Sequence, residues 1–159
     1  MMNTSLKIGR NICAAALLGL TVAAGGAAAH DGATGVVKER MDAMKTMGGA
    51  MKQLAAMMKG QSPFDAMAAT QAGMTIQGQA EGLLKLFPKG SDDMSSRAKP
   101  EVWTKWGEFE AATAALNKAS AALAGADMGA GKSDIMALFA GVGKSCKGCH
   151  EQFRKPKDK

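Results

Sequence analysis

Apolar side chains recur at helical spacing in four separate stretches of the chain. In the first stretch, from about Thr34 to Lys59, they follow one another in steps of three and four, at Met44, Met47, Met51, Leu54 and Met58. Such a stripe predicts an amphipathic helix that packs inside a bundle of helices. The sequence Gly60-Gln61-Ser62-Pro63 then predicts the end of this helix.

The second predicted helix begins at the same loop. Ser62 is a favourable N-cap residue, and Pro63 is favourable at the first helical position. The helical pattern ends near Leu86-Phe87-Pro88, and the polar stretch from Lys89 to Lys99 predicts the longest loop of the chain.

The third predicted helix begins at Pro100 and has the clearest period of all, with Val102, Trp106, Phe109, Thr113, Leu116, Ser120 and Leu123 on one stripe. The residues from Gly125 to Gly131 interrupt it. A fourth helix is predicted from about Ser133 to Pro156, with one stripe formed by Ile135, Leu138, Val142, Cys146, Cys149 and Phe153. Four such helices with mostly short links predict an all-α fold, an antiparallel four-helix bundle.

The composition supports a helical fold. The 159 residues include 47% apolar residues but only 4% aromatic residues, with no tyrosine and 13 methionines. Few β-branched or aromatic residues disfavour an all-β protein or an α/β enzyme. The length suits one domain, and the charged fraction of 21% argues against a disordered chain.

Residues 1–29 are interpreted as a cleaved secretory signal. Lys7 and Arg10 precede an apolar run from Ile12 to Ala24, and Ala27-Ala28-Ala29 provides small residues for cleavage after about Ala29. The run is too short for a strong prediction of a membrane span. The expected mature domain is therefore 30–159, exported to the periplasm, and it has lost Cys13.

The two remaining cysteines form the motif Cys146-Lys147-Gly148-Cys149-His150 near the C-terminus. On a helix, Cys146 and Cys149 share a face, and His150 lies four residues from Cys146. Two thiols at this spacing can each add to one vinyl group of a haem, and the adjacent imidazole can then reach the iron. The motif therefore predicts covalent attachment of one haem c.

Three other interpretations of the motif fit the sequence less well. A thioredoxin-like pair needs its first cysteine at a helix N-terminus, whereas this pair lies late in a helix. A zinc site needs four ligands, and the mature chain adds only His30 and His150 to the two thiols. A disulfide between residues three apart on a helix is geometrically awkward. With so few aromatic residues, the bundle also needs the haem to complete its core, so the apoprotein is expected to fold poorly.

The charge pattern suggests a partner only in general terms. The net charge is +6, and basic residues gather near the motif, at Lys144, Lys147, Arg154, Lys155, Lys157 and Lys159. This patch could attract an acidic redox partner, or it could be a solvated lysine-rich tail. The modest charge and the lack of an aromatic platform argue against nucleic acid.

The order of these landmarks resembles that of class II c-type cytochromes, the cytochrome c prime family with its low-spin relatives. The landmarks are Lys59-Gly60-Gln61-Ser62-Pro63-Phe64-Asp65, Leu86-Phe87-Pro88-Lys89-Gly90-Ser91, Lys99-Pro100-Glu101-Val102-Trp103 and the C-terminal haem motif followed by Phe153-Arg154. The resemblance implies a four-helix bundle with haem near one end, thioether bonds at Cys146 and Cys149, and His150 as the proximal iron ligand. It also implies that Arg154 lies beside the haem, unless it is a solvated residue of the basic tail, and that the protein could form a homodimer.

The resemblance leaves the sixth iron ligand, and so the function, open. The family's distal position falls on Met44, which either ligates the iron, as in the low-spin cytochromes c-556, or packs in the helical seam; Met41 and Met47 are weaker candidates. Arg40 is expected to pair with a haem propionate or with an acid on a neighbouring helix. His/Met ligation implies a periplasmic electron carrier. The alternative is a five-coordinate haem that binds nitric oxide or carbon monoxide. An enzyme is not expected, because the only spare histidine, His30, lies outside the bundle.

Overall fold

The computed structural model describes residues 33–156, so the predicted signal at 1–29 and His30 lie outside the described residues. The described part is helical, and its only β pairing is an isolated antiparallel bridge between Ala98 and Arg154. Its helices are α1 (Gly35–Met58), α2 (Ala66–Gly82), the 3₁₀ helix η1 (Leu83–Leu86), α3 (Glu101–Thr104), α4 (Trp106–Ala124) and α5 (Lys132–Phe153). The all-α prediction is confirmed. None of these helices is both long and apolar enough to cross a bilayer.

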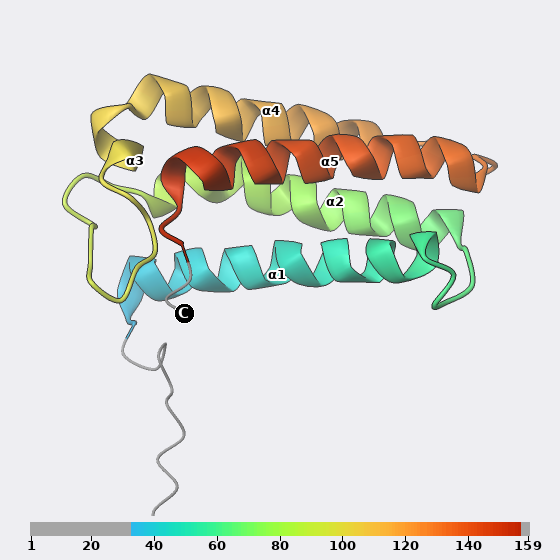
Figure 1. Cartoon of the computed structure of the whole chain (residues 1–159), viewed down its shortest axis with the longest axis horizontal. Coiled ribbons are helices and arrows are strands. Elements are labelled where there is room, and N and C mark those ends of the chain that lie inside the picture. Colours follow the sequence, from blue (N-terminus) through green and yellow to red (C-terminus); the bar gives the residue numbers. More distant parts are fainter. Residues whose placement is uncertain (1–32, 157–159) are drawn as a thin grey trace, which may run out of the picture.

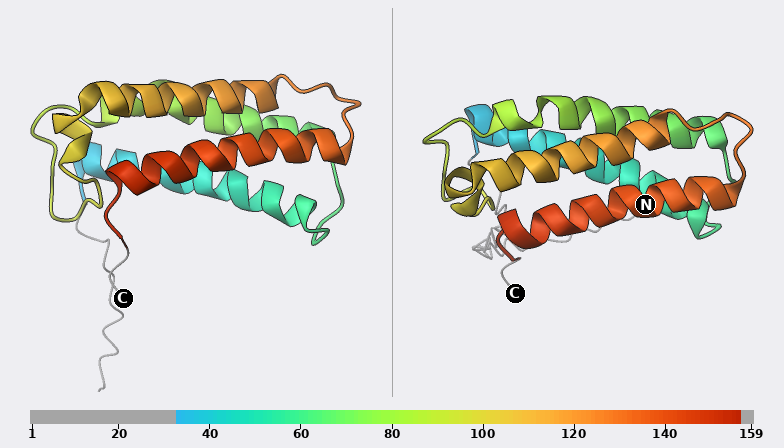
Figure 2. Two further views of the ribbon diagram at one scale, coloured as in Figure 1. Left: turned by 45° about the horizontal axis from the view of Figure 1, so that its top comes forward. Right: turned by 90° about the horizontal axis from the view of Figure 1, so that it is seen from above.

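The four long helices lie side by side and alternate in direction, as Figure 1 shows and the two views of Figure 2 confirm. Each helix packs on the next along the chain, with α2 on α4 and α4 on α5 making the most extensive contacts. Helices α1 and α5 close the bundle but touch each other only sparingly. The long loop before α3 and the C-terminal end of α5 lie at the same end of the molecule (Figure 1).

Helix α1 has the predicted bounds, but its buried face is rotated relative to the predicted stripe. Its buried positions are Val37, Arg40, Ala43, Met47, Ala50, Leu54 and Met57. Met44, Met51 and Met58 are only half-buried, since they lie at the edge of this face, packed against the core. The helix ends where Gly60 adopts a φ of 72° and the amide of Gln61 donates to the carbonyl of Ala56 over 2.9 Å. This is a Schellman motif, which favours glycine.

The predicted start of the second helix was wrong. Helix α2 begins at Ala66, and its N-cap is Asp65, whose carboxylate accepts a hydrogen bond from the amide of Ala68 at 3.1 Å. Ser62 and Pro63 lie in the preceding loop. Serine and aspartate are comparably strong N-caps, so the presence of Ser62 alone could not fix the start of the helix. Phe64, which lies between the two residues, packs against the core.

The third predicted helix is split into two. Lys105 leaves the helical conformation, with φ −120° and ψ 47°, and separates the short α3 from α4. The predicted stripe is nevertheless correct, because all its members are buried except Trp106, which is half-buried. Helix α4 meets α2 at very close range, since a Cβ added to Gly73 would lie 2.6 Å from the backbone nitrogen of Ala124.

Helix α5 carries the cysteine motif toward the end where the loop lies. Asp134 caps its start by accepting from the amide of Gly131 at 3.3 Å. The helix ends at Phe153, earlier than the predicted stop at Pro156. The reason is an alternative pairing: the amide of Lys155 donates to the carbonyl of Arg97 at 2.7 Å, and the amide of Lys99 donates to the carbonyl of Phe153 at 2.9 Å. The last described residues therefore run along the loop before α3.

Aromatic residues fill the same end of the bundle. Phe109 of α4 makes edge contacts with Phe87, at 4.8 Å between ring centroids, and with Phe153, at 5.3 Å. Trp103 and Trp106 flank this pair from outside. Five of the seven aromatic residues of the chain are thus gathered in one cluster.

Candidate haem site

The last turns of α5 place the three residues of the predicted attachment motif together. Cys146, Cys149 and His150 are all half-buried, and neither thiol is bonded to another cysteine. Both cysteines pack against the hydrophobic core. The helix therefore presents two free thiols and an imidazole toward the interior, as the spacing predicts.

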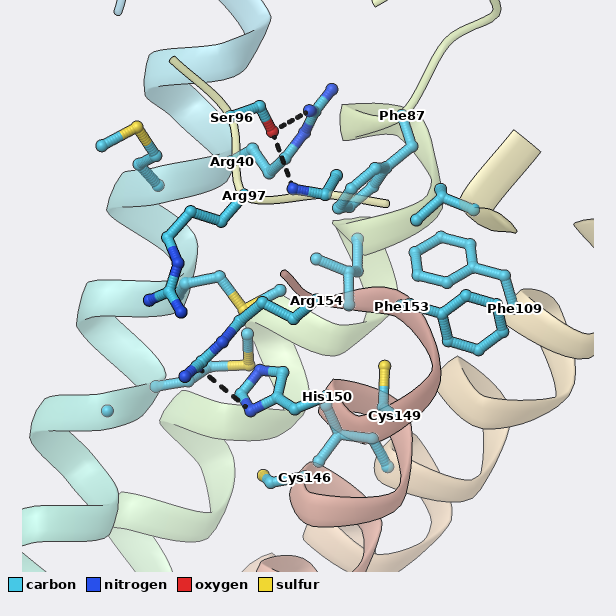
Figure 3. A pocket seen from close by; sticks show the side chains of 18 of the residues that line it. Arg40, Phe87, Ser96, Arg97, Phe109, Cys146, Cys149, His150, Phe153 and Arg154 are labelled. Atoms are coloured by element: carbon cyan, nitrogen blue, oxygen red, sulfur yellow. Dashed lines mark hydrogen bonds between the residues drawn. The ribbon is translucent and has the colours of Figure 1, made fainter. Parts of the chain in front are cut away.

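These side chains line a cavity of about 540 Å³ between α1 and α5. This volume lies within the range of small-molecule and cofactor sites, ~300–1,000 Å³. Its walls are mainly apolar and come from every long helix except α2, with Leu83 of η1 in place of that helix; they include Met41, Met44, Met47, Met51, Leu83, Phe87, Val102, Phe109, Leu116 and Phe153. Figure 3 shows the cavity with the motif of α5 on one side and α1 on the other.

Burial keeps both thiols in their protonated form. It raises the pKa of Cys146, and it raises the pKa of Cys149 to about 11, with the nearby charge of Cys146 as a second cause. These are the opposite of the lowered pKa values that activate a catalytic or redox cysteine. The raised pKa values therefore do not support the thioredoxin-like interpretation.

His150 is held as a neutral imidazole. Burial lowers the pKa of His150, and the positive charges of Arg154 and then Arg97 lower it further. Arg154 lies one turn along the helix, with its Nη1 3.4 Å from the Nδ1 atom of His150 (Figure 3). A neutral imidazole is the form that binds a metal ion. The structure thus places Arg154 on the wall of the cavity, beside the predicted iron ligand.

Arg40 also reaches the cavity, where its partners among the described residues are oxygens of η1 and of the following loop; pairing with a haem propionate stays a prediction. Its guanidinium donates to the carbonyl of Leu86 at 2.9 and 3.0 Å, to the hydroxyl of Ser91 at 2.8 Å and to the hydroxyl of Ser96 at 3.0 Å. Its Cζ lies 4.1 Å from the centre of the Phe87 ring. Among the described residues no acid on a neighbouring helix pairs with it. Burial lowers the pKa of Arg40, and the charge of Asp93 only partly opposes this.

The loop between η1 and α3 closes one end of the cavity, and sequence reasoning missed its role. Ser95, Ser96, Arg97 and Ala98 line the cavity. Arg97 is tied to the end of α5 in both directions, since its Nη2 atom donates to the carbonyl of Lys155 at 2.7 Å while its own carbonyl accepts from that residue's amide. A polar loop carries no periodic signal. Only the landmark residues on either side of it, Pro88, Pro100 and Trp103, could have indicated that its structure is fixed.

The wall opposite the motif is rich in sulfur. Met41, Met44, Met47 and Met51 of α1 all line the cavity, together with Gly48. Met47 is 5% exposed and belongs to the core, whereas Met41, Met44 and Met51 are half-buried. The candidate distal residue Met44 therefore lies on the cavity wall, as do both of its weaker alternatives.

The donor set and the cavity fit a covalently attached haem. The cavity is apolar, as a porphyrin requires, and two free thiols and one neutral imidazole lie on a single helix of its wall. Within the described residues no group of three or more histidine, cysteine or acidic side chains is placed to hold a metal ion directly. The fold and the site together define a class II c-type cytochrome.

Comparison with known proteins gives the family. The family model described as Cytochrome C' matches residues 35–154. The chain is 36% identical over 120 residues to a cytochrome c-556 of Agrobacterium tumefaciens, covering 76% of this chain and 97% of that protein. It is 39% identical over 119 residues to a cytochrome c' of Pararhodospirillum photometricum, covering 74% and 94%. The solved cytochrome c' of Rhodopseudomonas palustris matches with a TM-score of 0.73 and 31% identity, over 79% of this chain and all of that one.

The chain therefore belongs to the cytochrome c prime family, whose members carry one covalently bound haem c per chain. Its relatives include proteins named cytochrome c' and proteins named cytochrome c-556. Membership of the family therefore does not decide how the iron is coordinated in this chain.

Proposed function

We propose that Cys146 and Cys149 hold the haem through thioether bonds and that His150 is its proximal iron ligand. Three observations support these roles: the three side chains share one face of α5, they line the apolar cavity, and the thiols are free. The raised pKa values keep the thiols protonated, the form that adds across a vinyl group. Burial, and then the charges of Arg154 and Arg97, lower the pKa of His150 and favour the neutral imidazole that binds iron.

The function that the site supports best is one-electron transfer, with Met44 as the sixth iron ligand. The haem supplies the redox chemistry when bound, and the chain would supply both axial ligands and an apolar cavity around it. The observation that carries this proposal is the position of Met44, half-buried on the wall of α1 that faces the motif of α5. A thioether ligand raises the reduction potential, and fixed axial ligands suit outer-sphere electron transfer.

The lining of the cavity also favours a carrier over an enzyme. Apart from His150, the described residues that line it include no histidine and no carboxylate. General acid–base catalysis needs such a group within reach of the reacting atoms. The polar groups that are present, Arg40, Arg97, Arg154 and two serines, are suited to binding negative charge at the cavity rim.

The alternative function is that of a five-coordinate haem that binds nitric oxide or carbon monoxide. In that case Met44 packs against the core, as its half-buried position also allows. Nitric oxide complexes of cytochrome c prime variants from Alcaligenes xylosoxidans are among the solved structures of similar fold.

An absorption spectrum of the purified haem protein tests the choice. A low-spin spectrum with a methionine-to-iron charge-transfer band, unchanged by carbon monoxide, is expected. Met44→Ala should convert it to a high-spin spectrum that responds to carbon monoxide. Met58→Ala is the matched control, because Met58 is half-buried on the same helix but does not line the cavity. A high-spin, carbon monoxide-responsive spectrum of the unmodified protein would favour the gas-binding function.

We also infer export to the periplasm with cleavage after about Ala29, on the basis of the sequence alone. Covalent attachment of haem in bacteria follows export, so the cysteine motif and the predicted signal support each other. A homodimer through the first two helices remains a proposal carried over from the family resemblance. N-terminal sequencing and sedimentation of the purified protein test both points.

A further inference from the structure

A second, smaller groove lies on the outside of the same end of the bundle. It has a volume of about 420 Å³ and is lined by Leu84, Lys85, Phe87, Pro88, Lys89, Trp103 and Trp106. Both tryptophans are half-buried. The indole N–H of Trp103 donates to the carbonyl of Pro88 at 3.0 Å, so its hydrogen-bonding capacity is already used within the protein. The rest of the lining is apolar except for Lys85 and Lys89, which carry the charge of the groove.

The groove shares a wall with the haem cavity. Phe87 lines both of them. Its ring centroid lies 6.2 Å from that of Trp103 on the groove side and 4.8 Å from that of Phe109, which lines the cavity. A partner seated in the groove would thus be separated from the cavity by a single aromatic layer.

The charge of the groove is unbalanced. Lys85 and Lys89 are exposed, and neither forms an ion pair with any residue that the structure describes. No carboxylate lines the groove. By contrast, the lysines near the motif are partly engaged: Lys147 pairs with Glu151 at 3.7 Å, and Lys155 donates to the carbonyl of Ser96 at 3.4 Å.

We propose that this groove is the docking face for an acidic redox protein, which exchanges electrons with the haem across Phe87. The inference rests on the proposed function of electron carriage and names its partner class. Tryptophan-rich apolar centres with a charged rim are typical of protein contact sites, and unpaired lysines favour an acidic partner. The proposal thus assigns docking to Lys85 and Lys89 and not to the basic residues near the C-terminus.

The test measures how fast the ferric haem protein is reduced by two reagents at low ionic strength. One is the hydroquinone of flavodoxin, an acidic protein, which gives one electron to the ferric iron and becomes the semiquinone. The other is the semiquinone of lumiflavin, a small uncharged flavin. The double variant Lys85→Glu, Lys89→Glu is compared with Lys118→Glu, Lys132→Glu, which has the same net charge but changes exposed lysines elsewhere on the bundle.

The groove variant should be reduced by flavodoxin roughly tenfold more slowly than the unmodified protein, with the difference lost at high salt. The control variant should slow by less than about threefold, and lumiflavin should reduce all three proteins equally. Equal slowing of both variants by flavodoxin would overturn the proposal, because net charge alone would then explain the rates. A slower reaction with lumiflavin in the groove variant alone would also overturn it, since the lysines would then act through the haem site.

The outcome is separable from that of the carrier proposal. The spectrum of the Met44 variants decides the iron ligand without reference to the groove. A high-spin haem whose reduction by flavodoxin still depends on Lys85 and Lys89 would remove the ligand assignment and leave the docking face. A low-spin haem whose reduction by flavodoxin does not depend on these lysines would remove the docking face and leave the ligand assignment.

Discussion

At the scale of single residues, Arg40 shows how a buried charge can organise a loop. It is 4% exposed, yet no carboxylate within the described residues pairs with it. Its planar fork satisfies carbonyl and hydroxyl oxygens of the loop that closes the haem cavity, and its face covers Phe87. Lysine can supply neither the fork nor the stacking surface. The sequence indicated that Arg40 was important but not which atoms it contacts, because loop partners leave no periodic pattern.

Replacing this arginine should therefore destabilise the cavity end of the molecule. Arg40→Leu leaves the carbonyl of Leu86 and the polar atoms of Ser91 and Ser96 without their partner, so we expect a loss of about 3 kcal/mol in the free energy of unfolding. Arg40→Lys should lose about half as much. The control Lys38→Ala removes only an exposed pair with Asp42 and should change stability by less than about 0.5 kcal/mol. Urea unfolding of the haem protein measures the stability of all three variants. A loss for Arg40→Leu no larger than that for the control Lys38→Ala would contradict the role assigned to Arg40.

At the scale of elements, periodicity predicted the four long helices to within a few residues, and the exceptions have local causes. Helix α2 is capped by Asp65, three residues after the predicted cap Ser62. A backbone break at Lys105 carries no sequence signal strong enough to divide the third helix. The buried stripe of α1 is rotated because Met44 and Met51 face the cavity and not the centre of the core.

The contact of α2 with α4 depends on one glycine, which gives a prediction. A side chain at Gly73 would clash with the backbone of Ala124, so Gly73→Ala should destabilise the protein by about 2 kcal/mol or more, as overpacking does. Gly78 lies on the same helix with no atom within 4 Å of its added Cβ. There, Gly78→Ala should stabilise the helix by roughly 0.5–1 kcal/mol. Thermal unfolding compares the two variants; a melting temperature that Gly73→Ala leaves unchanged or raises would show that α2 and α4 do not pack this closely.

At the scale of the whole molecule, the bundle is built around a cavity that its own side chains do not fill. Helices α1 and α5 touch sparingly, and between them lies a space of about 540 Å³ with apolar walls. The cysteine motif predicted the cofactor, and the helical stripes predicted the wall that carries it. The wall formed by Phe87, Ser96 and Arg97 was harder to predict, since these residues lie between η1 and α3, where positions depend on tertiary contacts.

Protein cores are close-packed, and an apolar cavity of this size lacks the contacts that stabilise a core. The double variant Cys146→Ser, Cys149→Ser should fail to retain haem after denaturation and extraction, whereas the unmodified protein keeps it. Without haem we expect the melting temperature to fall by roughly 10 °C or more, because the attached porphyrin is buried only in the folded state and burial of its apolar surface stabilises that state. Near-UV circular dichroism should lose its fine structure before the helical signal disappears. An apoprotein that melts cooperatively at the temperature of the haem protein would show that the helices alone suffice to hold this bundle together.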